Sequence, residues 1–216
     1  MGDRVAYYKT IMLGDTIRGH ETPELAGEDP AIESALGATD PLLTERGGGS
    51  YYEVELIALM FRTDAESDDD FIVRKIALLV ALRSARGFGT GTTSLGDLAV
   101  CSDSDNIQTA SGSLTAGSNV AITTGVANVS TGQKWFISDG SNYEVFTSVA
   151  GSYAGGITAA VLVNNYSASA KLFKVTWTMP KAFLRAGIRI PGNEEGAQHA
   201  AKEIALRFVS LEDPTL

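Results

Sequence analysis

The side chains that most often carry nucleophilic chemistry are scarce in this sequence and lie far apart along it. Its one cysteine is Cys101, and its two histidines are His20 and His199. A thiol and an imidazole form a catalytic pair only where the fold brings them together. The residues around Cys101 contain no known nucleophile signature, and the chain contains no Gly-x-Ser-x-Gly turn. We therefore expect that the protein is not an enzyme.

Three consecutive carboxylates, Asp68–Asp70, are the first candidate for a metal site. Acidic ligands at alternate positions hold Ca²⁺ in a loop of fixed pattern, with glycine at the sixth position and glutamate at the twelfth. Val73 and Leu79 stand at those positions here. The triplet also precedes a helical pattern, and acidic residues stabilise the N-terminus of a helix. We therefore interpret it as the beginning of a helix and expect no metal.

The glycine-rich run Gly87–Thr93, with the sequence GFGTGTT, is the candidate for a phosphate-binding loop. A phosphate loop of the Walker type ends in Gly-Lys-Ser/Thr. This chain has no lysine between Arg86 and Lys134, and the run follows a predicted helix instead of a strand. We interpret it as a flexible linker and expect no cofactor.

The segment Trp135–Phe146 places aromatic residues on both sides of a small polar cluster. Its Asp139-Gly140 pair is a strong signal for a hairpin turn, and aromatic residues favour strands. If the hairpin faces outward, Trp135, Asp139, Gly140 and Tyr143 are the candidate residues of a carbohydrate-binding surface. The alternative, which we favour, is that the aromatic residues form the core of a small β-sandwich, because a unit of about 70 residues needs such a core.

Composition limits the classes of protein that these elements can form. The chain has 216 residues, is 44% hydrophobic and carries a net charge of −9 with a pI of about 4.7. A core is therefore possible, and long-range attraction to nucleic acid is disfavoured. The longest apolar run, Ile76–Leu82, is far shorter than the roughly 20 residues that span a bilayer. We expect a soluble protein without a membrane partner, which matures in a reducing cytoplasm.

The distribution of charge predicts two parts. Residues 87–170 contain only six of the 43 charged residues and show short β-type runs separated by Gly, Asn, Asp and Ser. We interpret 87–170 as an inserted low-charge β module with a linker. Residues 1–86 and 171–216 then form a second domain around it.

The flanking domain has its own order of predicted elements. The helix over 71–86 is indicated by apolar residues at helical spacing, with Ile72, Ile76, Leu79 and Val80 on one stripe. Pro180 predicts a bulge or an edge in its long β-type run. The remaining elements are a first strand over 5–13, a long loop over 14–50, a strand over 51–62, the β-type run over 172–190 and a final strand over 203–211.

The ending Glu203–Pro214, EIALRFVSLEDP, is similar to the closing strand and acidic-Pro tail of the tail tube proteins of tailed bacteriophages. Met179–Ala182 and Gly192–Gly196 are similar to the turn before that strand, and Val129–Val175 resembles small β modules of virion proteins. The order of elements agrees in outline. This resemblance implies a mainly β fold with one main α-helix: a β-sandwich or barrel core of the tail tube type, with an inserted small β-sandwich module.

In function, the resemblance implies a structural virion protein of the phage tail, assembled in the host cytoplasm. Six copies would form a ring, and stacked rings would form a tube through which DNA passes without specific binding. Other tail proteins, such as a tape measure or a terminator protein, would be partners. The loop over 14–50 would reach neighbouring subunits, and we expect its contacts to include Pro23, Pro30, Pro41, Leu42 and Leu43.

Two other classes of protein remain open. One is a different virion part, namely a neck, tail terminator or decoration protein. The other is a carbohydrate-binding or adhesin module that uses the Trp135–Phe146 hairpin.

Overall fold

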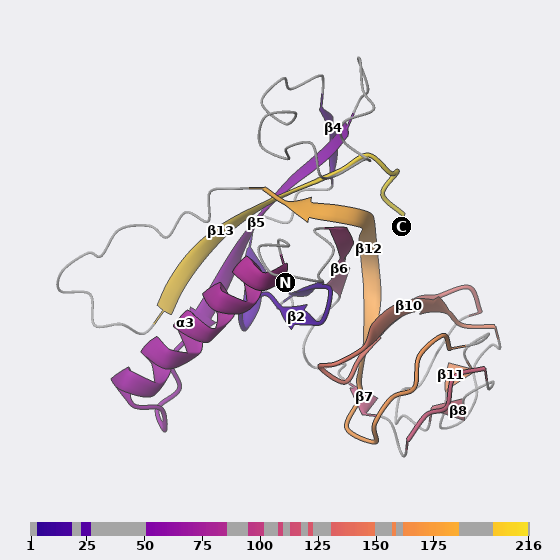
Figure 1. Cartoon of the computed structure of the whole chain (residues 1–216), viewed down its shortest axis with the longest axis horizontal. Coiled ribbons are helices and arrows are strands. Elements are labelled where there is room, and N and C mark those ends of the chain that lie inside the picture. The colour runs from indigo at the N-terminus through magenta and orange to yellow at the C-terminus, as the bar shows by residue number, and fades with distance from the viewer. Residues whose placement is uncertain are drawn as a thin grey trace. The chain divides into compact units, whose positions relative to one another are not determined.

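The computed structural model shows a mainly β protein with one helix among the residues it describes (Figure 1). Eleven of the described strands form a large antiparallel sheet, and this sheet is open. The predicted mainly β fold is therefore confirmed, whereas a closed barrel or sandwich core is not. The structure describes residues 4–18, 23–26, 51–85, 95–101, 108–109, 113–117, 121–122, 131–149, 157–158, 162–185 and 201–215.

The strands differ greatly in length. The four longest are β5 (Tyr51–Phe61), β6 (Leu95–Cys101), β12 (Lys171–Leu184) and β13 (Ala201–Ser210), and the helix is α3 (Asp68–Ala85). The other strands are β1 (Val5–Tyr8), β2 (Ile11–Met12), β3 (Thr16–Arg18), β4 (Glu24–Ala26), β7 (Gln108–Thr109), β8 (Ala121–Ile122), β9 (Lys134–Ser138), β10 (Tyr143–Thr147) and β11 (Ile157–Thr158).

The chain divides into two compact units, which we name by their most characteristic element. The hairpin unit comprises Met1–Met12, Ala99–Thr178 and Leu216, and contains β9 and β10. The helix unit comprises Leu13–Leu98 and Met179–Thr215, and contains α3. Residues 1–12 and 171–178 thus fall in the unit that holds the low-charge segment, although we assigned them to the flanking domain from their charge. Our division into domains stays a prediction.

Aromatic packing explains why the N-terminal strand belongs to the hairpin unit. The Tyr7 ring stacks on Phe136 with centroids 4.5 Å apart and lies 5.0 Å from Phe173.

The predicted single strand over 5–13 is wrong, because Lys9 has a left-handed φ of 56° and turns the chain between β1 and β2. Lysine carries no sequence signal for such a turn, which glycine or asparagine usually provides.

A second core cluster of the hairpin unit surrounds the hairpin itself. Trp135 and Ile137 on β9 and Phe146 on β10 are buried together with Leu162 and Tyr166. The ladder between β9 and β10 runs from Tyr143↔Ser138 to Thr147↔Lys134. The predicted hairpin at Asp139-Gly140 is therefore present, and its aromatic residues supply the core.

The centre of the helix unit is a long ladder between β5 and β13. It contains ten aligned pairs, from Ala201↔Phe61 to Ser210↔Tyr52. This confirms the predicted strands over 51–62 and 203–211, whose alternation buries Val54, Leu56, Ile204 and Leu206.

The other edge of β5 carries β3 and β4, which each pair with it over three residues. Both lie within 14–50, which we interpreted as a long loop. Strands of three residues are too short to show a recognisable alternation. Residues 27–50 of the predicted loop lie outside the described part.

The predicted bulge near Pro180 corresponds to a local change in β12. The strand continues through Pro180, and the next residue, Lys181, has a left-handed φ of 44°. Lys181 N donates to Asp97 Oδ1 at 3.1 Å, and the Pro180 carbonyl accepts the Ser210 hydroxyl. These bonds give the Lys181 N–H and the Pro180 carbonyl hydrogen-bond partners at the irregular position.

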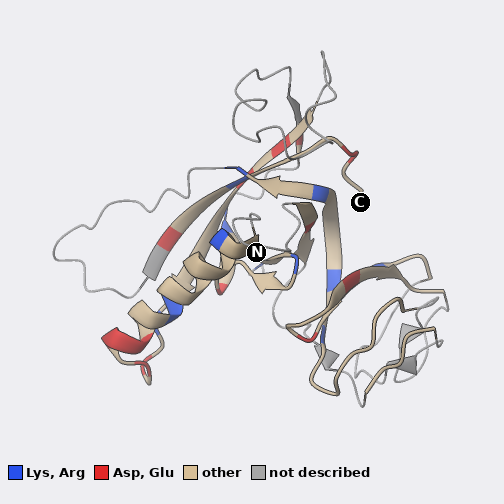
Figure 2. Ribbon diagram, in the orientation of Figure 1, with Lys and Arg blue, Asp and Glu red and all other residues tan. Residues whose placement is uncertain are grey.

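The helix α3 begins three residues earlier than predicted, because Ser67 caps it. Ser67 Oγ accepts from Asp70 N at 3.1 Å, and the Asp70 carboxylate accepts from Ser67 Oγ at 2.6 Å. The triplet Asp68–Asp70 thus forms the first turn, as the helix interpretation predicted. Figure 2 shows these acidic residues at one end of α3 and a basic residue, Arg83, near the other.

The predicted apolar stripe of the helix faces water. Phe71, Leu82 and Ala85 are buried, whereas Ile72 and Ile76 are 46% and 51% exposed. Periodicity identified the helix correctly but not the side that packs, because apolar residues lie on both sides.

Candidate functional site

The side chains suited to nucleophilic chemistry are not assembled in the described residues. Cys101 ends β6 and is fully buried, and burial raises the pKa of its thiol far above the ordinary value. A neutral buried thiol is a poor nucleophile. His20, His199 and the glycine-rich run 87–93 lie outside the described residues.

Several of the described carboxylates are engaged in other contacts. Among the residues that the structure describes, no group of three or more His, Cys, Asp or Glu side chains is placed to hold a metal ion. Within Asp68–Asp70, Asp68 pairs with Arg62 and Asp70 bonds Ser67. These contacts fix the beginning of α3.

The most concentrated group of charges lies in the helix unit, where Arg74 reaches back from α3. Its Nη1 donates to both carboxylate oxygens of Asp15 at 2.8 and 3.0 Å. Its Nε and Nη2 donate to the two oxygens of Glu66, each at 2.9 Å, and Nη2 also bonds the Phe61 carbonyl. One guanidinium thus connects the end of β5, the loop before β3 and the segment before α3.

The loop before β3 is itself fixed to β5. Asp15 N donates to the Leu59 carbonyl at 2.7 Å, and Asp15 Oδ2 accepts from Phe61 N at 2.7 Å. Gly14 has a φ of 74°, and a Cβ built there would lie 2.5 Å from the Leu59 carbonyl oxygen. Only glycine allows this close approach of two backbones.

The electrostatics of this cluster point to a structural clamp. Hydrogen bonds from Arg74 lower the pKa of Glu66, and those to Glu66 and Asp15 raise the pKa of Arg74. The surrounding hollow, of about 580 Å³, is lined by Asp15, Glu66, Asp70 and Arg74 together with Phe61, Thr63 and Ala65. Glu66 is held ionised against the Arg74 cation, so it is not poised to exchange a proton at neutral pH.

In the hairpin unit, a loop is fastened by hydrogen bonds from main-chain N–H groups to a carboxylate. Asp139 Oδ1 accepts from Ser141 N and Asn142 N at 3.0 and 2.9 Å, and its Oδ2 accepts from Ser167 N at 3.1 Å. These bonds lower the pKa of Asp139, and the bond from Asn142 has the largest effect. Gly140 completes the turn with a φ of 89°.

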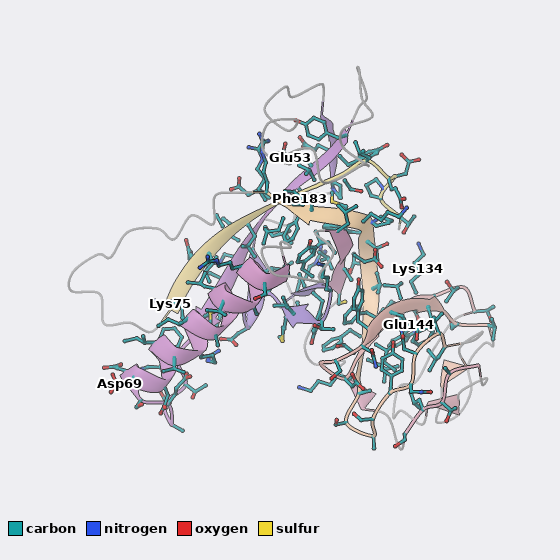
Figure 3. The ribbon with its side chains drawn as sticks, in the orientation of Figure 1. Glu53, Asp69, Lys75, Lys134, Glu144 and Phe183 are labelled. Carbon is teal, nitrogen blue, oxygen red and sulfur yellow. The ribbon has the colours of Figure 1, made fainter. Side chains whose placement is uncertain are left out.

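Glu144 fastens the same loop from the middle of β10 (Figure 3). Its carboxylate accepts from Val163 N at 3.0 Å, from Asn164 N at 3.3 Å and from Tyr166 Oη at 2.9 Å. Burial and the contact with Glu144 raise the pKa of Tyr166. Asp139 and Glu144 therefore hold residues 163–167 against the hairpin.

The position of Trp135 decides what the hairpin offers to a ligand. Trp135 is 1% exposed and lies in the core, and Tyr143 is half-buried against Phe136 with ring centroids 6.1 Å apart. Of the four residues predicted for a carbohydrate-binding surface, only Asp139, which is half-buried, and Gly140, which is exposed, lie in the turn. The Trp135 ring is thus not available as a platform for a sugar.

The predicted contacts of the 14–50 segment fall mostly outside the described residues. Pro23 is half-buried and directly precedes β4. Pro30, Pro41, Leu42 and Leu43 lie outside the described part.

Sequence reasoning missed three features. Arg74 and Asp15 are 59 residues apart, and no pattern joins them. The side of β13 that pairs with no described strand over Ala201–Leu206 becomes visible only when the order of strands in the sheet is known. The exposed apolar side of α3 did have a signal in the sequence, because the apolar residues of this helix form two stripes on opposite sides.

Comparisons with known proteins add no assignment: no family model matches this chain, and no curated protein does so. Within the described ranges, the one helix is not apolar enough over its length to cross a membrane.

Proposed function

We propose that this chain is a structural subunit of a phage tail, and that copies associate through the sheet of the helix unit into rings that stack as a tube. The proposal takes the ring of six copies and the transit of DNA from the resemblance of the C-terminal residues to tail tube proteins. The observation that carries it is one side of β13, which over Ala201–Leu206 pairs with no strand that the structure describes.

The two sides of β13 differ in their pairing. One side of the strand pairs with β5 along its whole length, but the other pairs with β12 only at Phe183↔Val209 and Leu184↔Phe208. Over Ala201–Leu206, no strand in the described part of the chain occupies that side. An edge of this length is a template for another strand, and a closed ring of copies removes such edges.

The backbone groups on this edge can be identified. Arg185 N donates to the Arg207 carbonyl at 2.8 Å, so the Arg207 backbone points to the side of β12. Backbone direction alternates along a strand, so the N–H groups of Glu203 and Ala205 point to the same open side. Those of Ile204 and Leu206 point to β5.

Charge is compatible with a tube that conducts DNA. The net charge of −9 repels a polyanion, so DNA would pass without adhering to the subunits. The same charge would be unfavourable for a protein that holds DNA in place.

The test is electron microscopy of the purified protein in negative stain over a range of concentrations. We expect rings and hollow tubes from the wild-type chain. Ala205→Pro should remove them, because proline lacks the outward N–H while the ladder to β5 keeps its bonds. Ala205→Val keeps this N–H and should still assemble.

Each failure has a distinct meaning. Monomers at all concentrations would refute the tail tube proposal. Rings that persist in Ala205→Pro, with folding shown by circular dichroism, would refute the role of the β13 edge. Closed rings that never stack would favour a neck or terminator protein.

A further inference from the structure

The helix α3 has apolar side chains on two opposite sides. Phe71, Leu82 and Ala85 form the buried side within the helix unit. Ile72, Ile76 and Val80, each four residues apart, form a stripe on the opposite side and are 46%, 51% and 57% exposed. A helix that is apolar all round normally has both sides covered.

The exposed stripe is broader than a single row. Val73 lies beside it and is 64% exposed, and Leu79 lies at its other margin and is half-buried. Isolated exposed apolar residues are common, but a contiguous stripe of branched aliphatic residues marks an interaction surface.

Two charged residues lie at the ends of this stripe. Asp69 is seven residues before Ile76 and Arg83 is seven after it, so both point to the same side of the helix as Ile76. Both are exposed, and neither has an ion pair with a residue in the described ranges. Asp69 is labelled at the first turn of α3 in Figure 3.

This arrangement is complementary to itself. When a second α3 is laid antiparallel with Ile76 opposite Ile76, Ile72 faces Val80, and Val73 and Leu79 flank these contacts along the two margins of the stripe. Asp69 then faces Arg83 at both ends. A two-fold pair of this kind places identical patches against each other, and the helix dipoles run in opposite directions.

From this self-complementarity we propose that the Ile72–Ile76–Val80 stripe is a homodimerisation surface, on which α3 of one copy packs antiparallel against α3 of a second copy about a two-fold axis at Ile76. The occupant is a second copy of this chain, because the charges at both ends match only in this orientation. The pair is independent of the β13 edge: rings could form without it, and it could form without rings.

A membrane surface fits the stripe less well. Interfacial helices place Lys and Arg beside their apolar side and are attracted to anionic lipids. Here the first turn is acidic and the whole chain is negative.

The decisive experiment reverses the charges one at a time and measures association by sedimentation velocity. It uses Ala205→Pro as the background, so that strand pairing does not contribute. Asp69→Arg and Arg83→Asp should each weaken the dimer by about tenfold or more, because like charges then face each other at both ends. An equimolar mixture of the two variants should restore it as a heterodimer, and so should the double variant.

Two further variants test the centre of the stripe. Ile76→Asp should weaken the dimer roughly thirtyfold or more, as expected for a central contact. Ile76→Cys, in a Cys101→Ser background, should form a disulfide-linked dimer on mild oxidation, whereas Lys75→Cys, on the flank of the helix, should not.

The proposal is overturned by any of three results. One is a chain that stays monomeric at high concentration, which would leave the stripe to a different partner. Another is a dimer that Ile76→Asp does not weaken. The third is a pair of charge variants that fail to restore each other on mixing.

Discussion

Each of the two units fastens a loop through an aspartate that lies next to a glycine. The hydrogen-bond donors to that aspartate differ between the units. In the helix unit, Asp15 follows Gly14 and meets the guanidinium of Arg74. In the hairpin unit, Asp139 precedes Gly140 and meets backbone N–H groups. Both carboxylates connect segments that are distant in sequence, yet one attachment is an ion pair and the other consists of main-chain hydrogen bonds.

The difference shows how much each attachment depends on a single side chain. The clamp loses all its guanidinium donors when Arg74 changes, and Asp15 keeps only the bond from Phe61 N. The attachment at Asp139 receives donors from three residues, and none of them requires a particular side chain. The helix unit should therefore be the more sensitive to substitution and to salt.

The largest expected difference comes from the two glycines. Gly14→Ala should destabilise the helix unit by about 3 kcal/mol, because a left-handed alanine is strained and its Cβ would lie 2.5 Å from the Leu59 carbonyl oxygen. Gly140→Ala meets no atom within 4 Å and should cost about 1 kcal/mol from the backbone alone. Urea unfolding of the two variants measures both. Equal destabilisation by the two substitutions would mean that the backbone around Gly14 moves to accommodate the added Cβ.

An intermediate effect is expected from removing one member of each attachment. Arg74→Met leaves the carboxylates of Asp15 and Glu66 facing each other and should cost about 2 kcal/mol. Glu144→Gln keeps one acceptor oxygen for the 163–167 loop and should cost about 1 kcal/mol.

Amide hydrogen exchange locates these changes. Val163 and Asn164 should exchange faster only in Glu144→Gln, and Phe61 only in Arg74→Met. A change that spreads across both units in either variant would contradict the separate attachments.

The smallest expected effects are the change of stability with pH and the change of the two carboxylate pKa values with salt. The folded pKa values of Glu66 and Asp139 lie below their ordinary values of 4.5 and 3.8. Each therefore contributes stability that is present above its unfolded pKa and is lost as the pH falls through the folded value. Added salt screens a pair of opposite charges more than it screens the hydrogen bonds from neutral N–H groups to a carboxylate. Carbon-detected NMR titration should show the Glu66 pKa rising in 1 M salt while that of Asp139 stays low, and equal responses would remove the distinction.

The regular parts of this fold could be predicted from the sequence because their signals are local. Alternation identified β5 and β13, and Asp139-Gly140 identified the hairpin. Helical spacing with an acidic first turn identified α3. Each of these patterns depends on residues within about twenty positions of one another.

The remaining features depend on contacts between distant segments. The turn at Lys9 uses a residue without a turn signal, and the Arg74 clamp joins positions 59 residues apart. Periodicity could not decide which side of α3 packs, because Phe71 and Ile72 begin two equally apolar stripes. Among the expected site residues, Trp135 could not be placed from the sequence. An aromatic residue in a strand is equally suited to packing in a core and to stacking against a sugar at the surface.

The attachment of the 163–167 loop has a consequence for how its surface can change during evolution. Val163 and Ser167 contribute only their N–H groups to the carboxylates, and the Val163 side chain is 77% exposed. Any residue except proline supplies the same donor. Selection can therefore vary the side chains at these two positions while the N–H donors that fasten the loop are kept.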